Sequence, residues 1–197
     1  MRTLFIVGWL FAGLAGVIYH FGPGQEHLEV DRINRVLDEA RTNVSLENYQ
    51  TALAQFDQVM ADLPEEKAEV AQRVLLEKTK AQMMAAQLPA ARATLESMLS
   101  DLRGDESSDP ELVADVQSTL ANAQYYMTWL MRLEGLPEEE WMPEIEAARQ
   151  HYTELNVKAS SRGDRKTAER AAEDLESAVR LARMDLNDLK ALPLPSQ

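Results

Sequence analysis

The stretch 47-ENYQTALAQFDQVMADLP-64 decides the fold of this 197-residue chain, because its apolar residues recur at steps of three and four. The apolar positions are Tyr49, Ala52, Leu53, Phe56, Val59, Met60 and Leu63. This spacing places them on one face of an α-helix. The helix ends at Pro64, because proline lacks a backbone donor. The stretch therefore predicts an amphipathic helix with a defined end.

The rest of the body shows the same kind of pattern. Ala, Leu, Glu, Gln, Arg and Met are abundant, and all of them are good helix formers. Few segments show the alternation and β-branched enrichment of strands. We predict an all-α fold in which Ser45, Asp109 and Asp164 are N-caps. The expected helices cover about residues 26–43, 45–63, 64–86, 88–103, 109–134, 143–155 and 164–191.

The spacing within the opening stretch also indicates a repeat. Steps of 3, 4, 3 and 5 residues separate Tyr49, Ala52, Phe56, Val59 and Pro64. This series resembles the second helix of a tetratricopeptide (TPR) repeat, where aromatic residues fill the gap to the next hairpin and Ala allows close helix approach. The resemblance implies a stack of antiparallel helical hairpins that binds other proteins. A generic helical bundle is the alternative.

A weaker copy of the series follows. It keeps the first three steps and lies 39 residues further on, whereas the family repeats at about 34. Arg103 replaces the terminating proline, and a third copy, around residues 148–155, is looser. The resemblance is best over residues 45–64. The residues of the weaker copy are Leu88, Ala91, Leu95 and Met98.

The N-terminal segment predicts a membrane anchor. Residues 4–21 are apolar apart from small glycines and His20, and Gly22-Pro23-Gly24 follows them. As a helix this run spans about 27 Å, close to the hydrocarbon core of a bilayer. The alternative is a cleaved signal peptide with a processing site at 13-GLA-15. Arg2 before the run favours a cytoplasmic N-terminus and an extracytoplasmic body in a bacterial-type envelope.

These features divide the chain into three predicted parts. Residues 1–24 form the transmembrane anchor, residues 25–156 form the TPR-like hairpin domain, and residues 157–197 form a C-terminal capping helix with an extended tail.

The charge of the body argues against nucleic acid as a partner. The formal net charge is −13, and residues 26–155 hold 26 acidic against 11 basic residues. Such a surface repels phosphates. The chain has no cysteine, which excludes disulfides, thiolate metal sites and a cysteine nucleophile.

The aromatic residues of the C-terminal half are the candidate partner-binding surface. Aromatic side chains anchor many interfaces. The alternative is that they form the core between two long helices. The group comprises Tyr125, Tyr126, Trp129, Trp141 and Tyr152.

Other polar groups carry weaker signals. The three histidines His20, His27 and His151 lack metal-ligand spacing, and the loop 105–111 lacks an EF-hand register. The acidic run 138–146 fits a helix N-terminus, and Arg162-Gly163-Asp164 matches an adhesion tripeptide that chance also produces. Basic residues at 158–170 are expected to form a solvated helix start. We predict no catalytic residue, cofactor, metal or small-molecule substrate.

The sequence therefore predicts a membrane-anchored interaction scaffold or assembly factor that is not an enzyme. The alternative is a single-span structural or accessory subunit of a larger membrane complex. The sequence does not indicate the identity of the protein partner.

Overall fold

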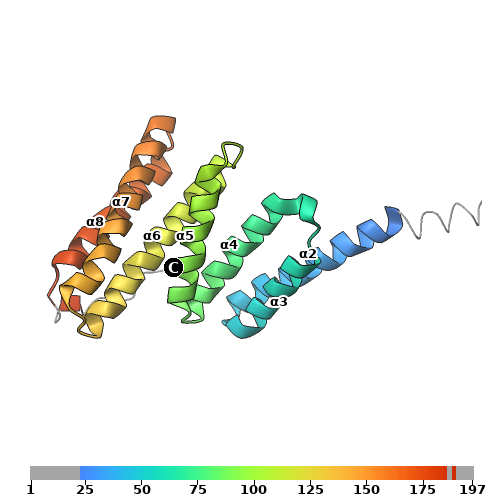
Figure 1. Cartoon of the computed structure of the whole chain (residues 1–197), viewed down its shortest axis with the longest axis horizontal. Helices are drawn as coiled ribbons and strands as arrows, with labels where there is room; N and C mark the ends of the chain where they lie inside the picture. The colour runs from blue at the N-terminus through green and yellow to red at the C-terminus, as the bar shows by residue number, and fades with distance from the viewer. Residues whose placement is uncertain (1–22, 186–187, 190–197) are drawn as a thin grey trace, which may run out of the picture. The chain divides into compact units, whose positions relative to one another are not determined.

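The fold is all-α, as predicted. A computed structural model describes residues 23–185 and 188–189, and this part contains seven α-helices, one 3₁₀ turn and no strand (Figure 1). The elements are α2 (Pro23–Ser45), α3 (Tyr49–Asp62), η1 (Glu65–Lys67), α4 (Ala68–Met84), α5 (Leu88–Gly104), α6 (Pro110–Leu133), α7 (Glu138–Arg162) and α8 (Arg165–Arg183).

The predicted membrane anchor at residues 4–21 lies outside the described residues. Among the helices of residues 23–185, none is long and apolar enough to cross a bilayer. The anchor therefore stays a prediction.

Four of the connections between helices share one turn. In each, one residue has a positive φ, and the N–H of the next residue donates to a carbonyl five residues earlier, which is the Schellman-type helix end. The positive φ values are 60° at Glu47, 59° at Ala86, 77° at Gly135 and 74° at Gly163. The hydrogen bonds run from Asn48 to Asn43, Gln87 to Gln82, Leu136 to Met131 and Asp164 to Ala159, at 2.8–3.0 Å.

The first two of these turns lie 39 residues apart, at the offset found in the sequence. Ala52 and its counterpart Ala91 are both 0% exposed. Phe56 and Leu95 are likewise buried, as are Val59 and Met98, whereas Tyr49 is half-buried and Pro64 is exposed. The pairs α2–α3 and α4–α5 thus share a turn and corresponding buried positions, which is compatible with a helical repeat, but α2 packs closely on α3 whereas α4 and α5 make few close contacts.

The chain divides into two compact units, Met1–Val74 and Leu75–Gln197. In the first, α2 packs on α3. Its buried apolar residues are Ile33, Leu37, Ala40, Ala52, Leu53, Phe56, Val59 and Val74.

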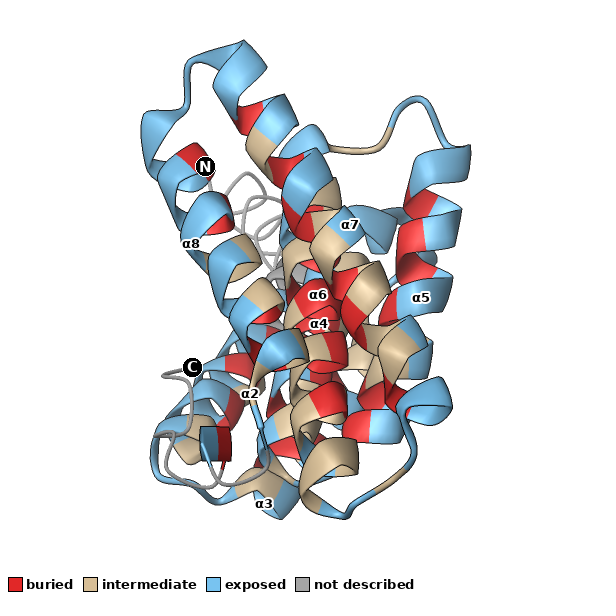
Figure 2. Ribbon diagram, turned by 90° about the vertical axis from the view of Figure 1, so that its left-hand side faces the viewer, coloured by how far each residue is buried: buried red, intermediate tan, exposed pale blue. Residues whose placement is uncertain are grey.

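In the second unit each helix from α5 to α8 packs on the next one along the chain (Figure 1). One core cluster joins Leu76 of α4 to α5 and α6, and another joins α6 to α7 and α8. Figure 2 shows the buried residues as stripes along the helices and a mostly exposed α8. The division of the chain into domains after residues 24 and 156 stays a prediction.

Several predicted helix limits were wrong. Ser45 does not cap the second helix, because it is the last residue of α2 and its hydroxyl donates to the Thr42 carbonyl; Asn48 occupies the N-cap position of α3. After Pro64 the chain forms η1 before α4 starts at Ala68. The last helix ends at Arg183, well before residue 191.

The sixth predicted helix is the largest error. We expected residues 143–155, but α7 covers Glu138–Arg162 and contains Pro143 in its second turn. Pro137, in an extended conformation, takes the N-cap position. The segment 156–162 continues the helix, because Ala159 is buried and Asn156 donates to the carbonyl of Ala168 in α8 at 2.8 Å.

Candidate protein-binding surfaces

An open groove of about 750 Å³ lies on the α2–α3 hairpin. It follows α2 for three turns, and one residue of α3 completes its wall. Every lining side chain is polar: Asp31, Asn34, Arg35, Asp38, Glu39, Thr42, Asn43 and Gln55. The groove is shallow, and most of these side chains are exposed to solvent.

A chain of amide hydrogen bonds crosses the end of this groove. Asn48 donates to the Asn43 side chain at 3.3 Å, Asn43 donates to Gln55 Oε1 at 2.9 Å, and Gln55 Nε2 donates to Glu39 Oε2 at 3.3 Å. The chain ends on a carboxylate, which accepts several hydrogen bonds at once. Glu39 is therefore held in place while it keeps capacity for a ligand.

The groove is negatively charged. Three carboxylates, those of Asp31, Asp38 and Glu39, line it together with the single guanidinium of Arg35. Asp38 also contacts Arg41 at 3.3 Å, but both side chains are largely exposed, and such pairs are weak. The groove thus favours a cationic ligand.

Sequence reasoning missed this groove. Its signal in the sequence is a polar stripe at residues 31, 34–35, 38–39 and 42–43, beside the apolar stripe of α2. A solvated helix face gives the same pattern, and Gln55 joins only through the fold.

The predicted aromatic group lies largely in the interior of the second unit. Trp141 is 7% and Tyr152 2% exposed, and both belong to the cluster that joins α6, α7 and α8. Tyr125 and Trp129 pack against the same cluster, and Tyr126 packs against the neighbouring one. Within this group, the residues that reach solvent are Tyr125, Tyr126 and Trp129 of α6, which are half-buried.

One buried hydroxyl of this group, that of Tyr152, is hydrogen-bonded within the core. Tyr152 donates to Asn122 Oδ1 at 2.6 Å, and burial raises the pKa of Tyr152 far above its ordinary value of 10.0. Burial also raises the pKa of Tyr125 and, on α8, that of Asp174. In each case burial disfavours the charged form of the side chain.

Arg132 links the ends of three helices. Its guanidinium lies 4.7 Å from the ring centroid of Trp141 on α7. The same guanidinium donates to the carbonyls of Leu181 and Met184 at the C-terminal end of α8. These carbonyls have no partner within the helix, so a cation here satisfies them.

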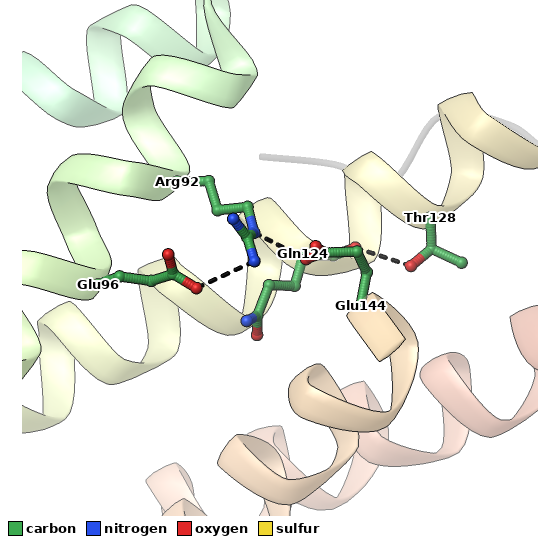
Figure 3. Close-up of polar contacts among 5 residues, drawn as sticks. All are labelled: Arg92, Glu96, Gln124, Thr128 and Glu144. Atoms are coloured by element: carbon green, nitrogen blue, oxygen red, sulfur yellow. Dashed lines mark hydrogen bonds and ion pairs between the residues drawn. The ribbon is translucent and has the colours of Figure 1, made fainter. Parts of the chain in front are cut away.

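Two arginine–glutamate pairs connect α5 to α7. Arg92 contacts Glu144 at 2.8 Å and Glu96 of its own helix at 3.0 Å (Figure 3). Arg103 contacts Glu154 at 2.7 Å, about three turns further along both helices. The pairs hold two helices that are not neighbours in the chain.

The helix between them, α6, contributes buried amides. Gln117 donates to Glu154 Oε2 at 2.9 Å and is 0% exposed; Gln124 is 3% exposed and accepts from Thr128 at its backbone carbonyl (Figure 3). The Gln117 contact connects α6 to α7, and the two ion pairs connect α5 to α7, whereas the Thr128 hydrogen bond lies within α6.

The remaining predicted groups have local partners. Asp105 accepts from Ser107, Asp109 caps α6 through the Glu111 N–H, and Asp164 caps α8 through the Thr167 N–H. Arg162-Gly163-Asp164 forms the α7–α8 turn. Within residues 23–185 and 188–189, no three His, Cys, Asp or Glu side chains converge as metal ligands.

The acidic run at 138–146 and the histidines have different surroundings. Glu138, Glu139 and Glu140 are exposed in the first turn of α7, whereas Glu146 pairs with Arg149 at 2.5 Å. The His20 and His27 side chains lie outside the described residues. His151 is half-buried, and burial together with Arg103 lowers its pKa.

No protein-family model matches the chain, and the search of curated proteins finds no match.

Proposed function

We propose that this protein is a membrane-anchored, TPR-like scaffold or assembly factor that binds other proteins and performs no chemistry itself. The observation that carries the proposal is that α2–α3 and α4–α5 share a turn and buried positions 39 residues apart. Proteins built from successive helical hairpins expose one helix of each hairpin along a surface, and they bind partners there.

Residues 4–21 would place this scaffold at a membrane, with the acidic body on the extracytoplasmic side. The negative charge of the body disfavours nucleic acid and anionic lipid, so the expected ligand is a protein. The partner is expected to contact the helical body by shape, hydrogen bonds and charge.

A single-span accessory subunit of a larger complex is the second candidate. Apolar side chains that reach solvent support it: Leu46 is 63% and Val157 61% exposed. In a subunit, such positions are covered by permanent neighbours.

Affinity purification of the full-length chain from its native membrane, after chemical crosslinking, tests both candidates. A scaffold is expected to release its partner in high salt and to stay folded and monomeric afterwards. A subunit is expected to keep stoichiometric partners and to aggregate when they are removed. Recovery of the chain alone, with catalytic turnover of a small molecule, would contradict both.

A further inference from the structure

We propose that protonation of His151 in acid opens the contact between α5 and α7. This acid response is a property of the fold and goes beyond the proposed function. The evidence is the way in which α5 and α7 are joined, the position of His151 at their contact and the charges around it.

Polar side chains join α5 to α7. Both helices pack closely on α6, but they make at most a few close contacts with each other. In the part of the chain that the structure describes, one core cluster includes α5 and α6 without α7, and the other includes α6 and α7 without α5. The α5–α7 contact therefore depends on the ion pair Arg92–Glu144, drawn in Figure 3, and on the pair Arg103–Glu154.

The second of these pairs belongs to a hydrogen-bonded group that all three helices share. Glu154 Oε2 accepts from Arg103 of α5 at 2.7 Å and from Gln117 Nε2 of α6 at 2.9 Å. The same Gln117 nitrogen also donates to the carbonyl of His151 at 3.3 Å. Because Gln117 is 0% exposed, its amide needs these protein partners.

His151 lies beside this group with a ring nitrogen that is not hydrogen-bonded. Its Nδ1 is buried and has no partner among the described residues. A neutral imidazole with its proton on Nε2 leaves Nδ1 unprotonated, whereas the imidazolium has a donor on both nitrogens. Protonation therefore buries a charged donor that needs an acceptor, and this costs far more than burying a neutral nitrogen.

The charges around His151 come from both sides of the α5–α7 contact. Burial and the positive charge of Arg103 lower the pKa of His151, although Glu154 and Glu96 oppose the shift. An imidazolium that takes Glu154 as its acceptor also competes with Arg103 for that carboxylate. The groups that act on His151 are Arg103 and Glu96 of α5, Glu154 and Lys158 of α7, and the neutral amide of Gln117 of α6.

Acid should therefore separate α5 from α7 while both helices stay on α6. In the closed contact His151 resists protonation, whereas in an open contact its ring reaches water and binds a proton near the ordinary pKa of 6.5. The form that binds the proton more readily is favoured as the pH falls, so the open form gains population below pH 6.5.

A distance measurement between α5 and α7 tests the proposal. The chain has no cysteine, so introduced cysteines carry spin labels at chosen positions only. Ser100→Cys on α5 and Ser160→Cys on α7 are both exposed sites, and pulsed electron spin resonance measures the distance between their labels in the full-length chain in detergent. The variant His151→Gln cannot be protonated in this range, and the control His27→Gln removes a histidine of α2.

Between pH 7.5 and 5, we expect the label distance to lengthen by about 2 Å or more, the scale of helix shifts in switching proteins. The control should respond like the natural chain, and His151→Gln should keep the short distance throughout. Circular dichroism should show constant helix content. No change in the natural chain, the same change in His151→Gln, or a loss of helix content over this range would overturn the proposal.

A second measurement covers the case in which His151→Gln does not fold. Nuclear magnetic resonance follows the titration of the His151 ring in the natural chain, which has three histidines. The label distance should change with the same midpoint as this ring, below pH 6.5. Different midpoints, or a His151 midpoint at or above 6.5, would overturn the proposal. No partner takes part in either measurement, so the acid response and the scaffold function can fail separately.

Discussion

At the scale of single residues, the repeated turn predicts a measurable cost in the free energy of unfolding wherever a residue other than glycine takes the left-handed conformation. Gly135 and Gly163 supply the left-handed conformation in two turns, but Glu47 and Ala86 supply it in the others. For L-residues this conformation costs about 1–2 kcal/mol, part of which glycine avoids. Ala86→Gly should therefore stabilise the chain by about 0.5–1 kcal/mol, measured by urea denaturation followed by tryptophan fluorescence.

The matched comparison is Gly163→Ala in the α7–α8 turn. A Cβ at Gly163 meets no atom within 4 Å, so any change reports the backbone alone. We expect a loss of about 1 kcal/mol. If Ala86→Gly and Gly163→Ala shift stability in the same direction, the two turns do not share a left-handed residue at these positions.

His151 predicts a pH dependence. Its folded-state pKa is lowered from 6.5, first by burial and then by Arg103, although Glu154 and Glu96 oppose the shift. The unfolded chain then binds more protons at acid pH, so the free energy of unfolding should fall as the pH drops below 6.5 towards the folded value. His151→Gln should reduce this loss in urea denaturation between pH 7.5 and 5; parallel curves for the two proteins would contradict it.

At the scale of elements, helix caps distinguish the observed boundaries from the predicted ones. Asp109 accepts from the Glu111 N–H at 3.0 Å, whereas the Ser45 hydroxyl caps no helix start. Asp109→Ala should cost about 1 kcal/mol of stability, and Ser45→Ala should have almost no effect. Chemical denaturation measures the stability of both variants. A larger loss of stability for Ser45→Ala than for Asp109→Ala would support the helix start at Ser45 that the sequence predicted.

The limits of α7 show what sequence patterns miss. Pro143 indicated a helix start, because proline is favoured in the first turn. The true start lies at Glu138, where three glutamates suit the positive end of the helix dipole. The polar segment after Leu155 looked like a loop, but packing of Ala159 and the Asn156 contact to α8 extend the helix. Tertiary contacts of this kind have no local signature.

At the scale of the whole molecule, a helical repeat would give equal responses at corresponding sites. Ala52 and Ala91 are both 0% exposed. Leucine at either position should overpack its hairpin and destabilise it by about 1–3 kcal/mol. Ala54 and Ala93, also 39 residues apart, are exposed, so leucine there should change little. Thermal and urea unfolding of the four variants tests this, and a large cost at only one buried alanine would contradict the repeat.

The all-α class, most of the helices and the 39-residue offset were accessible from the sequence, because periodicity and Ala spacing are local properties. The α2–α3 groove was not, since it needs Gln55 from one helix beside Glu39 from another. The aromatic group was found, but whether Trp141 and Tyr152 face a core or a partner depends on how α8 packs.

The most direct test of the scaffold account is site-specific photocrosslinking in the native membrane. A photoreactive residue replaces Asn34 on α2 in one variant and the exposed Gln150 on α7 in another. The account predicts a discrete crosslinked protein partner from at least one of these positions, and none without irradiation. No crosslinked protein from either position would contradict it.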